Sequence, residues 1–188
     1  MQDLVKTLTL TTGVALTISL TGTFPAQAVT LNFGWNGDGG YSARGAFNYD
    51  ESTAPASFSE SGFGTTKFLR SLSIAFFNPL NNLVAAYNNV VNSNSTAQYF
   101  KFNFNTVTQE IFGLIDLGGE VAGDTYLSGT VNTNLSLYQV PQFGSDFIID
   151  KNSGAIAVTT VPEPSPVLGV LALSAVGITY RIKRQLKH

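Results

Sequence analysis

The sequence contains no cysteine, and its single histidine, His188, is the last residue. Without cysteine the chain can form no disulfide, no thiolate metal site and no cysteine nucleophile, so core packing alone must stabilise a folded domain. Without another histidine, a Ser-His-Asp triad or a histidine-ligated metal is excluded from everything before residue 188. The G-x-S-x-G and Walker A motifs are also missing, and the segment 62–67 begins like a dinucleotide fingerprint but fails at Lys67. We therefore predict that the protein is not an enzyme and holds no cofactor.

Charge is also scarce, at 12% of residues, and half of the basic residues lie near the two ends of the chain. Between Val29 and Thr160 the acidic residues outnumber the basic ones by ten to five. Such a surface does not attract a phosphate backbone, so nucleic acid is not an expected partner.

The N-terminus has the order of features that a signal peptidase reads. Lys6 precedes an apolar run over residues 8–20, and the small-residue triplet Ala26-Gln27-Ala28 follows. Small side chains such as Ala26 and Ala28 fit the two specificity positions of that peptidase. We predict a signal peptide over residues 1–28, read by the Sec machinery and cleaved after Ala28; a buried N-terminal strand is the alternative.

The C-terminus combines prolines, an apolar run and a basic end. After Pro162-Glu163-Pro164 the apolar run 167–180 leads into a cluster formed by Arg181, Lys183, Arg184 and Lys187. Counted over about residues 164–182, the run is just long enough for a membrane-spanning helix. By the positive-inside rule, the basic end at 181–188 stays in the cytoplasm and everything before Pro162 lies outside.

This tail resembles the PEP-CTERM sorting signal of bacteria that make extracellular matrices. The resemblance covers residues 161–188 and rests on the Pro162-Glu163-Pro164 motif, the short helix and the terminal basic cluster in the right order. It implies that an exosortase, a membrane-embedded protease or transpeptidase, processes the chain near the motif and releases or reattaches the domain outside. An unprocessed single-span anchor is the alternative.

Between the ends, at residues 29–160, apolar side chains alternate with polar ones, which is typical of strands with one face on a core. Gly- and Asn-rich turns separate these runs. We predict one all-β domain of about eight strands, an antiparallel β-sandwich or jelly-roll. The alternating runs include residues 31–35, 68–77, 99–105, 131–137 and 156–158; residues 80–91 fit a helix as well as a strand, and their Asn content favours a strand.

Three segments of this domain, 45–50, 77–79 and 115–119, are similar to uncharacterised cyanobacterial PEP-CTERM proteins. That resemblance supports the fold and implies no activity.

Three kinds of ligand chemistry remain open for the domain. A glycosidase needs only two carboxylates, and Asp116 with Glu120, or Asp50 with Glu51, could supply them. The oxygen atoms of Asn36 and Asp38 lie in a Gly-rich loop and could bind calcium, although their spacing differs from an EF-hand. Aromatic rings could stack on sugars, and the candidates are Trp35, Tyr41, Tyr87, Tyr99, Tyr126 and Tyr138. Of these, Trp35 is expected in the core, because it alternates in phase with Leu31 and Phe33.

We predict an exported, non-catalytic surface or extracellular-matrix protein, first membrane-anchored and then placed at the cell surface, envelope or matrix of a biofilm. Its expected partners are signal peptidase, the Sec machinery, exosortase and the membrane, and exopolysaccharide is a further candidate. The alternative is a carbohydrate-binding module for cell-surface or matrix polysaccharide, with a carboxylate hydrolase as a third reading.

Overall fold

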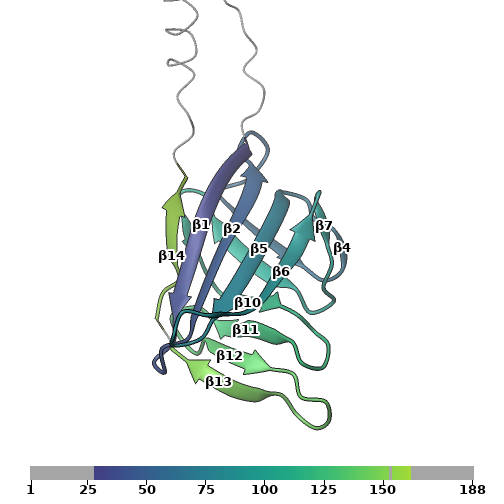
Figure 1. Cartoon of the computed structure of the whole chain (residues 1–188). Helices are drawn as coiled ribbons and strands as arrows, with labels where there is room; N and C mark the ends of the chain where they lie inside the picture. The colour runs from purple at the N-terminus through teal and green to yellow at the C-terminus, as the bar shows by residue number, and fades with distance from the viewer. Residues whose placement is uncertain (1–27, 153, 162–188) are drawn as a thin grey trace, which may run out of the picture.

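The described part of the chain forms two antiparallel β-sheets (Figure 1). It is known from a computed structural model that describes residues 28–152 and 154–161. Sheet A contains β14 (Ala157–Thr160), β1 (Ala28–Asn36), β2 (Ser42–Asp50), β5 (Leu69–Phe77), β6 (Leu83–Val91), β7 (Asn94–Ser95) and β4 (Gly64–Thr65), in that order. Sheet B contains β13 (Phe147–Lys151), β12 (Ser136–Gln139), β11 (Thr125–Thr130), β10 (Leu114–Gly118), β8 (Lys101–Asn105) and β3 (Ser57–Ser61), with β9 (Glu110–Ile111) also paired to β8.

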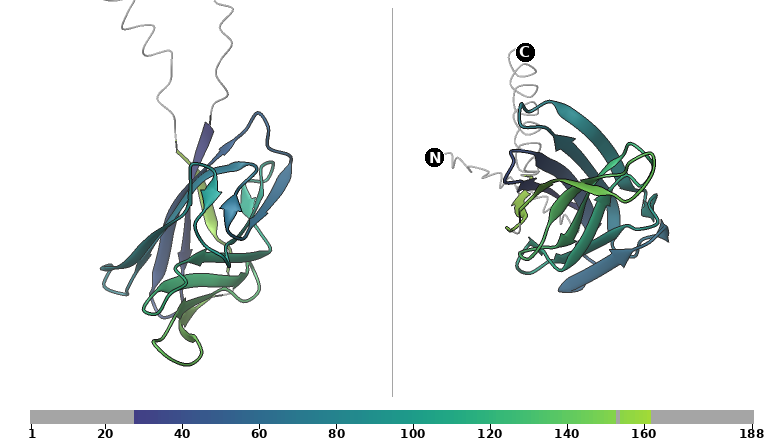
Figure 2. Two further views of the ribbon diagram at one scale, coloured as in Figure 1. Left: turned by 90° about the vertical axis from the view of Figure 1, so that its right-hand side faces the viewer. Right: turned by 90° about the horizontal axis from the view of Figure 1, so that it is seen from below.

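The two sheets pack face to face as a β-sandwich, and the expectation of an all-β domain is confirmed. In Figure 1 the strands β1, β2, β5 and β6 run lengthwise between the top and the bottom of the picture, whereas β10 to β13 run across it, behind and below them. Figure 2 shows the same two layers from the side and from below. Because each sheet turns one face inward, one set of alternating residues fills the space between them.

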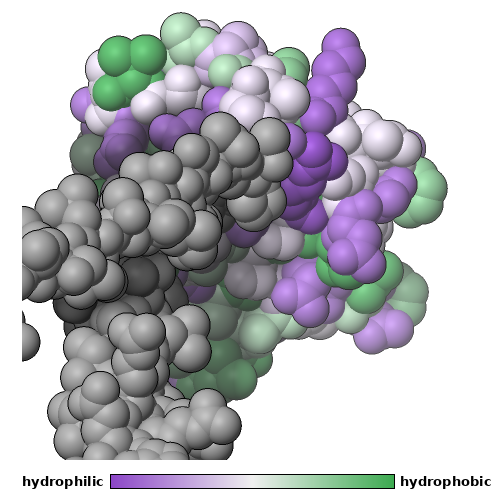
Figure 3. Space-filling model, turned by 90° about the horizontal axis from the view of Figure 1, so that it is seen from above, coloured by the Kyte–Doolittle hydropathy of each residue, from purple (hydrophilic) through white to green (hydrophobic). Residues whose placement is uncertain are grey.

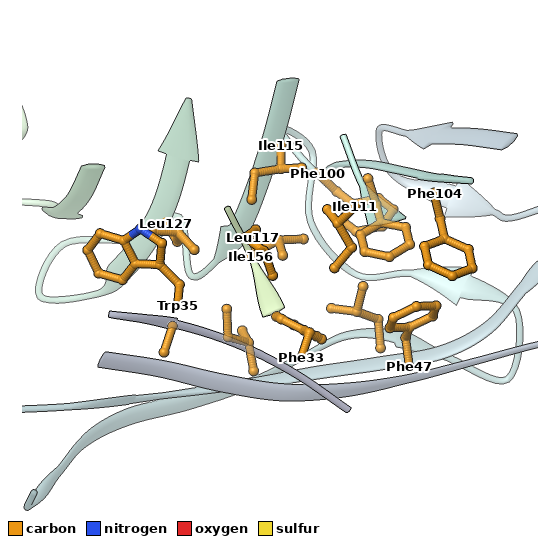
Figure 4. Packing of buried hydrophobic residues seen from close by; sticks show 14 of the residues in the cluster. Phe33, Trp35, Phe47, Phe100, Phe104, Ile111, Ile115, Leu117, Leu127 and Ile156 are labelled. Atoms are coloured by element: carbon orange, nitrogen blue, oxygen red, sulfur yellow. The ribbon is translucent and has the colours of Figure 1, made fainter. Parts of the chain in front are cut away.

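The alternation seen in the sequence corresponds to this burial. Leu31, Phe33 and Trp35 of β1 are almost completely buried, as are Phe102 and Phe104 of β8 in the opposite sheet. Figure 4 shows Phe33, Trp35 and Phe104 in this core. The ring of Phe47 from β2 lies with its centroid 4.9 Å from that of Phe102 and 4.8 Å from that of Phe104, in edge-to-face geometry. Such pairs contribute about 0.5–1.5 kcal/mol beyond their buried area, so aromatic packing between the sheets stabilises the domain.

Two segments bear on the strand predictions. The ambiguous segment is a strand, β6, as its Asn content favoured. The prediction of a strand from Val131 is wrong, because residues 131–133 form a turn and β12 begins only at Ser136. Asn132 has a φ of 63° and the Asn134 side chain accepts a hydrogen bond from the Thr130 amide, so local turn chemistry outweighs the alternation.

The first and last strands are neighbours. β1 pairs antiparallel with β14, with Leu31 opposite Thr160, and the Val161 amide donates to the carbonyl oxygen of Thr30. The chain therefore enters at Ala28 and leaves after Val161 at the same end of sheet A (Figure 1). Around that end the visible surface mixes hydrophilic and hydrophobic residues (Figure 3). Asp50, which lies opposite Ala28 in the register of β1 and β2, forms an ion pair with Arg70 at 3.0 Å.

Several predicted features lie outside the described residues. They are Ala26 and most of the signal peptide, the sorting motif Pro162-Glu163-Pro164, the predicted helix at 164–182, and the basic residues Arg181, Lys183, Arg184 and Lys187. Residues 28–152 and 154–161 contain no helix that is long and apolar enough to span a membrane.

Candidate functional site

One of the two predicted carboxylate pairs lies in a hollow. Asp116 and Glu120 both line a hollow of about 300 Å³ on the outer side of sheet B, together with Tyr99, Gly119, Tyr126, Val140 and Asp146. We call this hollow the tyrosine slot. The other pair is not brought together in this way: Asp50 binds Arg70 and the Ser52 side chain, and Glu51 is an exposed turn residue.

The slot lies where three loops meet one sheet face. Asp116 and Tyr126 come from the neighbouring strands β10 and β11, on the face opposite the buried Leu117 and Leu127. Glu120 follows β10, while Val140 and Asp146 belong to the loop between β12 and β13. Tyr99 precedes β8 and is 64% exposed, so one wall of the slot is an accessible aromatic ring.

Glu120 fixes the wall that carries Tyr99. Its Oε2 atom accepts the backbone amide of Gln98 at 2.9 Å, and its Oε1 atom accepts the backbone amide of Tyr99. The carboxylate therefore ties the loop after β10 to the segment before β8. Because an ionised carboxylate has about four lone-pair sites, these two bonds leave acceptor capacity free.

Tyr126 also lines the slot, and neighbouring side chains hold both its ring and its hydroxyl. Its ring stacks on Tyr138 of β12, with centroids 5.0 Å apart and planes 11° from parallel. Its hydroxyl donates to Asp146 Oδ2 at 2.7 Å. Burial, followed by this hydrogen bond and the Asp146 charge, raises the pKa of Tyr126, so the hydroxyl remains a donor to Asp146.

The surroundings of Asp116 shift the pKa of its carboxyl group. Burial raises its pKa to about 6, and the charges of Glu120 and Asp146 act in the same direction. The Ser128 hydroxyl donates to Asp116 Oδ2 at 2.9 Å, and Lys101 lies opposite on β8; both lower the pKa without reversing the shift. Around neutral pH this side chain can therefore change between a donor and an anionic acceptor.

Polar links between the sheets hold the loop that carries Glu120. The buried Asn89 of β6 exchanges two hydrogen bonds with the backbone of Gly118, at 2.7 and 3.0 Å. The Tyr87 hydroxyl donates to Asp124 Oδ1 at 3.2 Å and accepts the Thr125 amide at 3.0 Å. The connection between β10 and β11, which carries Glu120, is thus held by side chains of sheet A.

The Gly-rich loop considered for calcium has another role. Asp150 of β13 is 6% exposed and accepts the backbone amides of Gly39 at 2.8 Å and Tyr41 at 3.0 Å. Asp38 accepts the Asn152 side chain at 2.9 Å, and Asn36 ends β1. The loop therefore turns its amides toward a carboxylate of the protein, and in the described residues no group of three or more His, Cys, Asp or Glu is arranged to hold a metal ion.

The aromatic candidates divide into two groups. Trp35 is buried, as expected, and Tyr41 and Tyr87 pack against the core. Tyr99, Tyr126 and Tyr138 lie at or beside the slot. Asp146 was not singled out from the sequence, whereas the alternation of Tyr126 and Tyr138 with the apolar Leu127 and Leu137 is a signal that could have placed both rings on the outer face.

A broader hollow of about 690 Å³ lies on the outer face of sheet A. Its lining is mostly small residues such as Gly34, Ala46, Ser73 and Ala86. The one cationic side chain there, Arg44, already donates to Asn81 Oδ1 and lies over the Phe77 ring, 4.7 Å from its centroid. The tyrosine slot, which combines rings and convergent polar groups, is therefore the better candidate for a ligand site.

Comparison of the chain with protein-family models, with curated proteins and with solved structures found no match.

Proposed function

We propose that the protein is an exported, non-catalytic surface or extracellular-matrix protein, sorted through its PEP-CTERM-like tail. In this proposal residues 1–28 are a signal peptide, the C-terminal segment at about 164–182 is a transmembrane helix, and an exosortase acts near Pro162-Glu163-Pro164. The folded part, a jelly-roll-like sandwich, then stands outside the membrane.

The pairing of β1 with β14 is the observation that carries the proposal. The predicted signal cleavage follows Ala28, the first residue of β1, and the predicted sorting motif begins two residues after β14 ends at Thr160. Both processing points thus adjoin the same end of the domain. Cleavage at either one leaves the core between the sheets intact, because the core residues lie between Leu31 and Ile156.

Intact-mass spectrometry of the protein recovered separately from membrane and medium of its native cell tests this proposal. We expect a mass that lacks residues 1–28 and the segment after about Pro164. A mass that retains residues 167–188 in both fractions would contradict sorting-enzyme processing and leave a plain membrane-anchored domain. Glu163→Ala should block processing, while Pro166→Ala, just outside the motif, serves as the matched control.

A second candidate function, carbohydrate binding, is favoured by the tyrosine slot. Sugars bind proteins through ring stacking on aromatic faces combined with hydrogen bonds from their hydroxyls, and the slot offers Tyr99, Tyr126 and three carboxylates in one hollow. Affinity electrophoresis of the full chain in gels containing the native cell's polysaccharide tests it. We expect Tyr99→Ala and Tyr126→Ala to lose the retardation and Phe63→Ala, an exposed aromatic outside the slot lining, to keep it. No retardation of the unchanged protein would contradict this candidate.

A further inference from the structure

We propose that the tyrosine slot takes a sugar unit that bears a free, protonated amino group, as in a glycan of unacetylated hexosamine. This inference rests on the second proposed function, carbohydrate binding, and names the class of ligand. It stands on the hollow itself, the two tyrosines that line it and the kind of polar side chain found among its lining residues.

The slot offers acceptors rather than donors. Asp116, Glu120 and Asp146 are its acidic side chains, and the Tyr126 hydroxyl already donates to Asp146. Among the described residues, Asp116 Oδ1 and Asp146 Oδ1 have no hydrogen-bond donor, since the Ser128 and Tyr126 hydroxyls use the Oδ2 atoms. An ammonium group brings three N–H donors on one atom, and sugar hydroxyls bring one each.

The negative charge of the slot further restricts the class of sugar that it can bind. Three acids and no basic residue line the slot, and Lys101 lies opposite Asp116 on β8, outside that lining. A uronic acid would bring a fourth carboxylate into this site and be repelled, whereas a protonated amine is attracted. A divalent cation is not the better occupant, because no three of these carboxylates in the described chain are arranged to hold a metal ion.

The walls are held in place before a ligand arrives. Glu120 binds the backbone at Gln98 and Tyr99, and Asp146 binds the Tyr126 hydroxyl, so each ring wall is tied to one carboxylate. Tyr138 supports Tyr126 from the far side. Fixing rings and charges in advance lowers the entropic cost of binding, and an ammonium near a tyrosine face gains a cation–π contribution.

Isothermal titration calorimetry of the full chain in a non-ionic detergent at pH 7 tests the inference. The probes are a glucosamine tetramer, its N-acetylated counterpart and a galacturonic acid tetramer. We expect the glucosamine tetramer to bind about 10-fold more tightly than the N-acetylated one and the uronate not to bind. Glu120→Gln and Asp146→Asn should each reduce that preference by weakening binding of the glucosamine tetramer more than binding of the N-acetylated one; Tyr126→Ala should remove binding of both.

Glu51→Gln is the matched control, because Glu51 is an exposed acid outside the slot lining. If Glu51→Gln lowers the preference as much as Glu120→Gln, the amine binds the acidic surface at large and the inference is overturned. Equal affinity for the two hexosamine tetramers also overturns it, while leaving carbohydrate binding in place. If no sugar binds, carbohydrate binding and this inference both fail, and the sorting proposal is judged by its own mass measurement.

Discussion

Replacement of Asn89 by alanine should sharply reduce the stability of the domain. Asn89 is 2% exposed, and its side chain joins the sheets: Nδ2 donates to the Gly118 carbonyl at 2.7 Å, and the Gly118 amide donates to Oδ1 at 3.0 Å. The Asn89→Ala change leaves both backbone groups without a partner in a buried place. Each such group costs about 1–3 kcal/mol, so we expect a loss of about 2–6 kcal/mol in the free energy of unfolding.

Trp35 provides the assay. It is the sole tryptophan of the chain and is 2% exposed, so its fluorescence reports exposure of the core during urea unfolding of the full chain in a non-ionic detergent. Asn88→Ala is the control, because the neighbouring Asn88 is exposed and should change stability by less than about 0.5 kcal/mol. If Asn89→Ala unfolds at the same urea concentration as Asn88→Ala, the bridge does not join the sheets as argued.

Three further predictions use the same unfolding assay. Gly118→Ala should destabilise strongly, because φ is +138° and an added Cβ would lie 2.5 Å from the carbonyl oxygen of Thr125; wild-type stability would contradict the register of β10 and β11. Phe47→Ala should cost about 3–5 kcal/mol by leaving a cavity between the sheets, and a cost below about 1 kcal/mol would show that the rings repack. Burial raises the pKa of Asp116 to about 6 in the folded protein; the charges of Glu120 and Asp146 add to this shift, and Ser128 and Lys101 only reduce it. The folded state therefore holds a proton that the unfolded state releases near pH 4. Stability should therefore fall as the pH rises from about 4 to 6, and Asp116→Asn should flatten that fall; an equally steep fall in the variant would contradict the assignment.

The strand faces could be predicted because the pattern that specifies them is local. Burial with a period of two is visible in Leu31, Phe33 and Trp35 without knowledge of any partner strand. The two-residue strands β4, β7 and β9 could not be predicted in this way, since they are too short to show an alternation.

The buried polar side chains that bind backbone groups could not be predicted from local sequence patterns. Glu60 is 7% exposed and its Oε1 atom accepts the amides of Lys67 and Phe68 at 2.9 and 2.7 Å. Asp150 and Asn89 likewise bind backbone groups that are distant in sequence. A polar residue on a core face interrupts the apolar pattern, and only the folded chain supplies the partner that makes its burial favourable.

The candidate site was predictable only in part for the same reason. Asp116 and Glu120 are four residues apart, so their proximity could be expected from the sequence alone. Tyr99 precedes that pair in the sequence and Asp146 follows it, and both lie in loops. The pairing of β8, β10, β11 and β12 brings these loops to the slot. That pairing depends on long-range register, which a single sequence does not reveal.

The position of β14 determines how the domain would bear mechanical load. β14 lies at the edge of sheet A, antiparallel to β1, and traction on the chain beyond Val161 pulls along the strand axis. Resistance comes from the ladder between residues 157–160 and 31–34 acting together, and from Ile156, whose buried side chain must be drawn out of the core. A ligand held on sheet B and an anchor at the C-terminus would thus be connected in shear, a geometry in which the hydrogen bonds yield collectively instead of opening one after another.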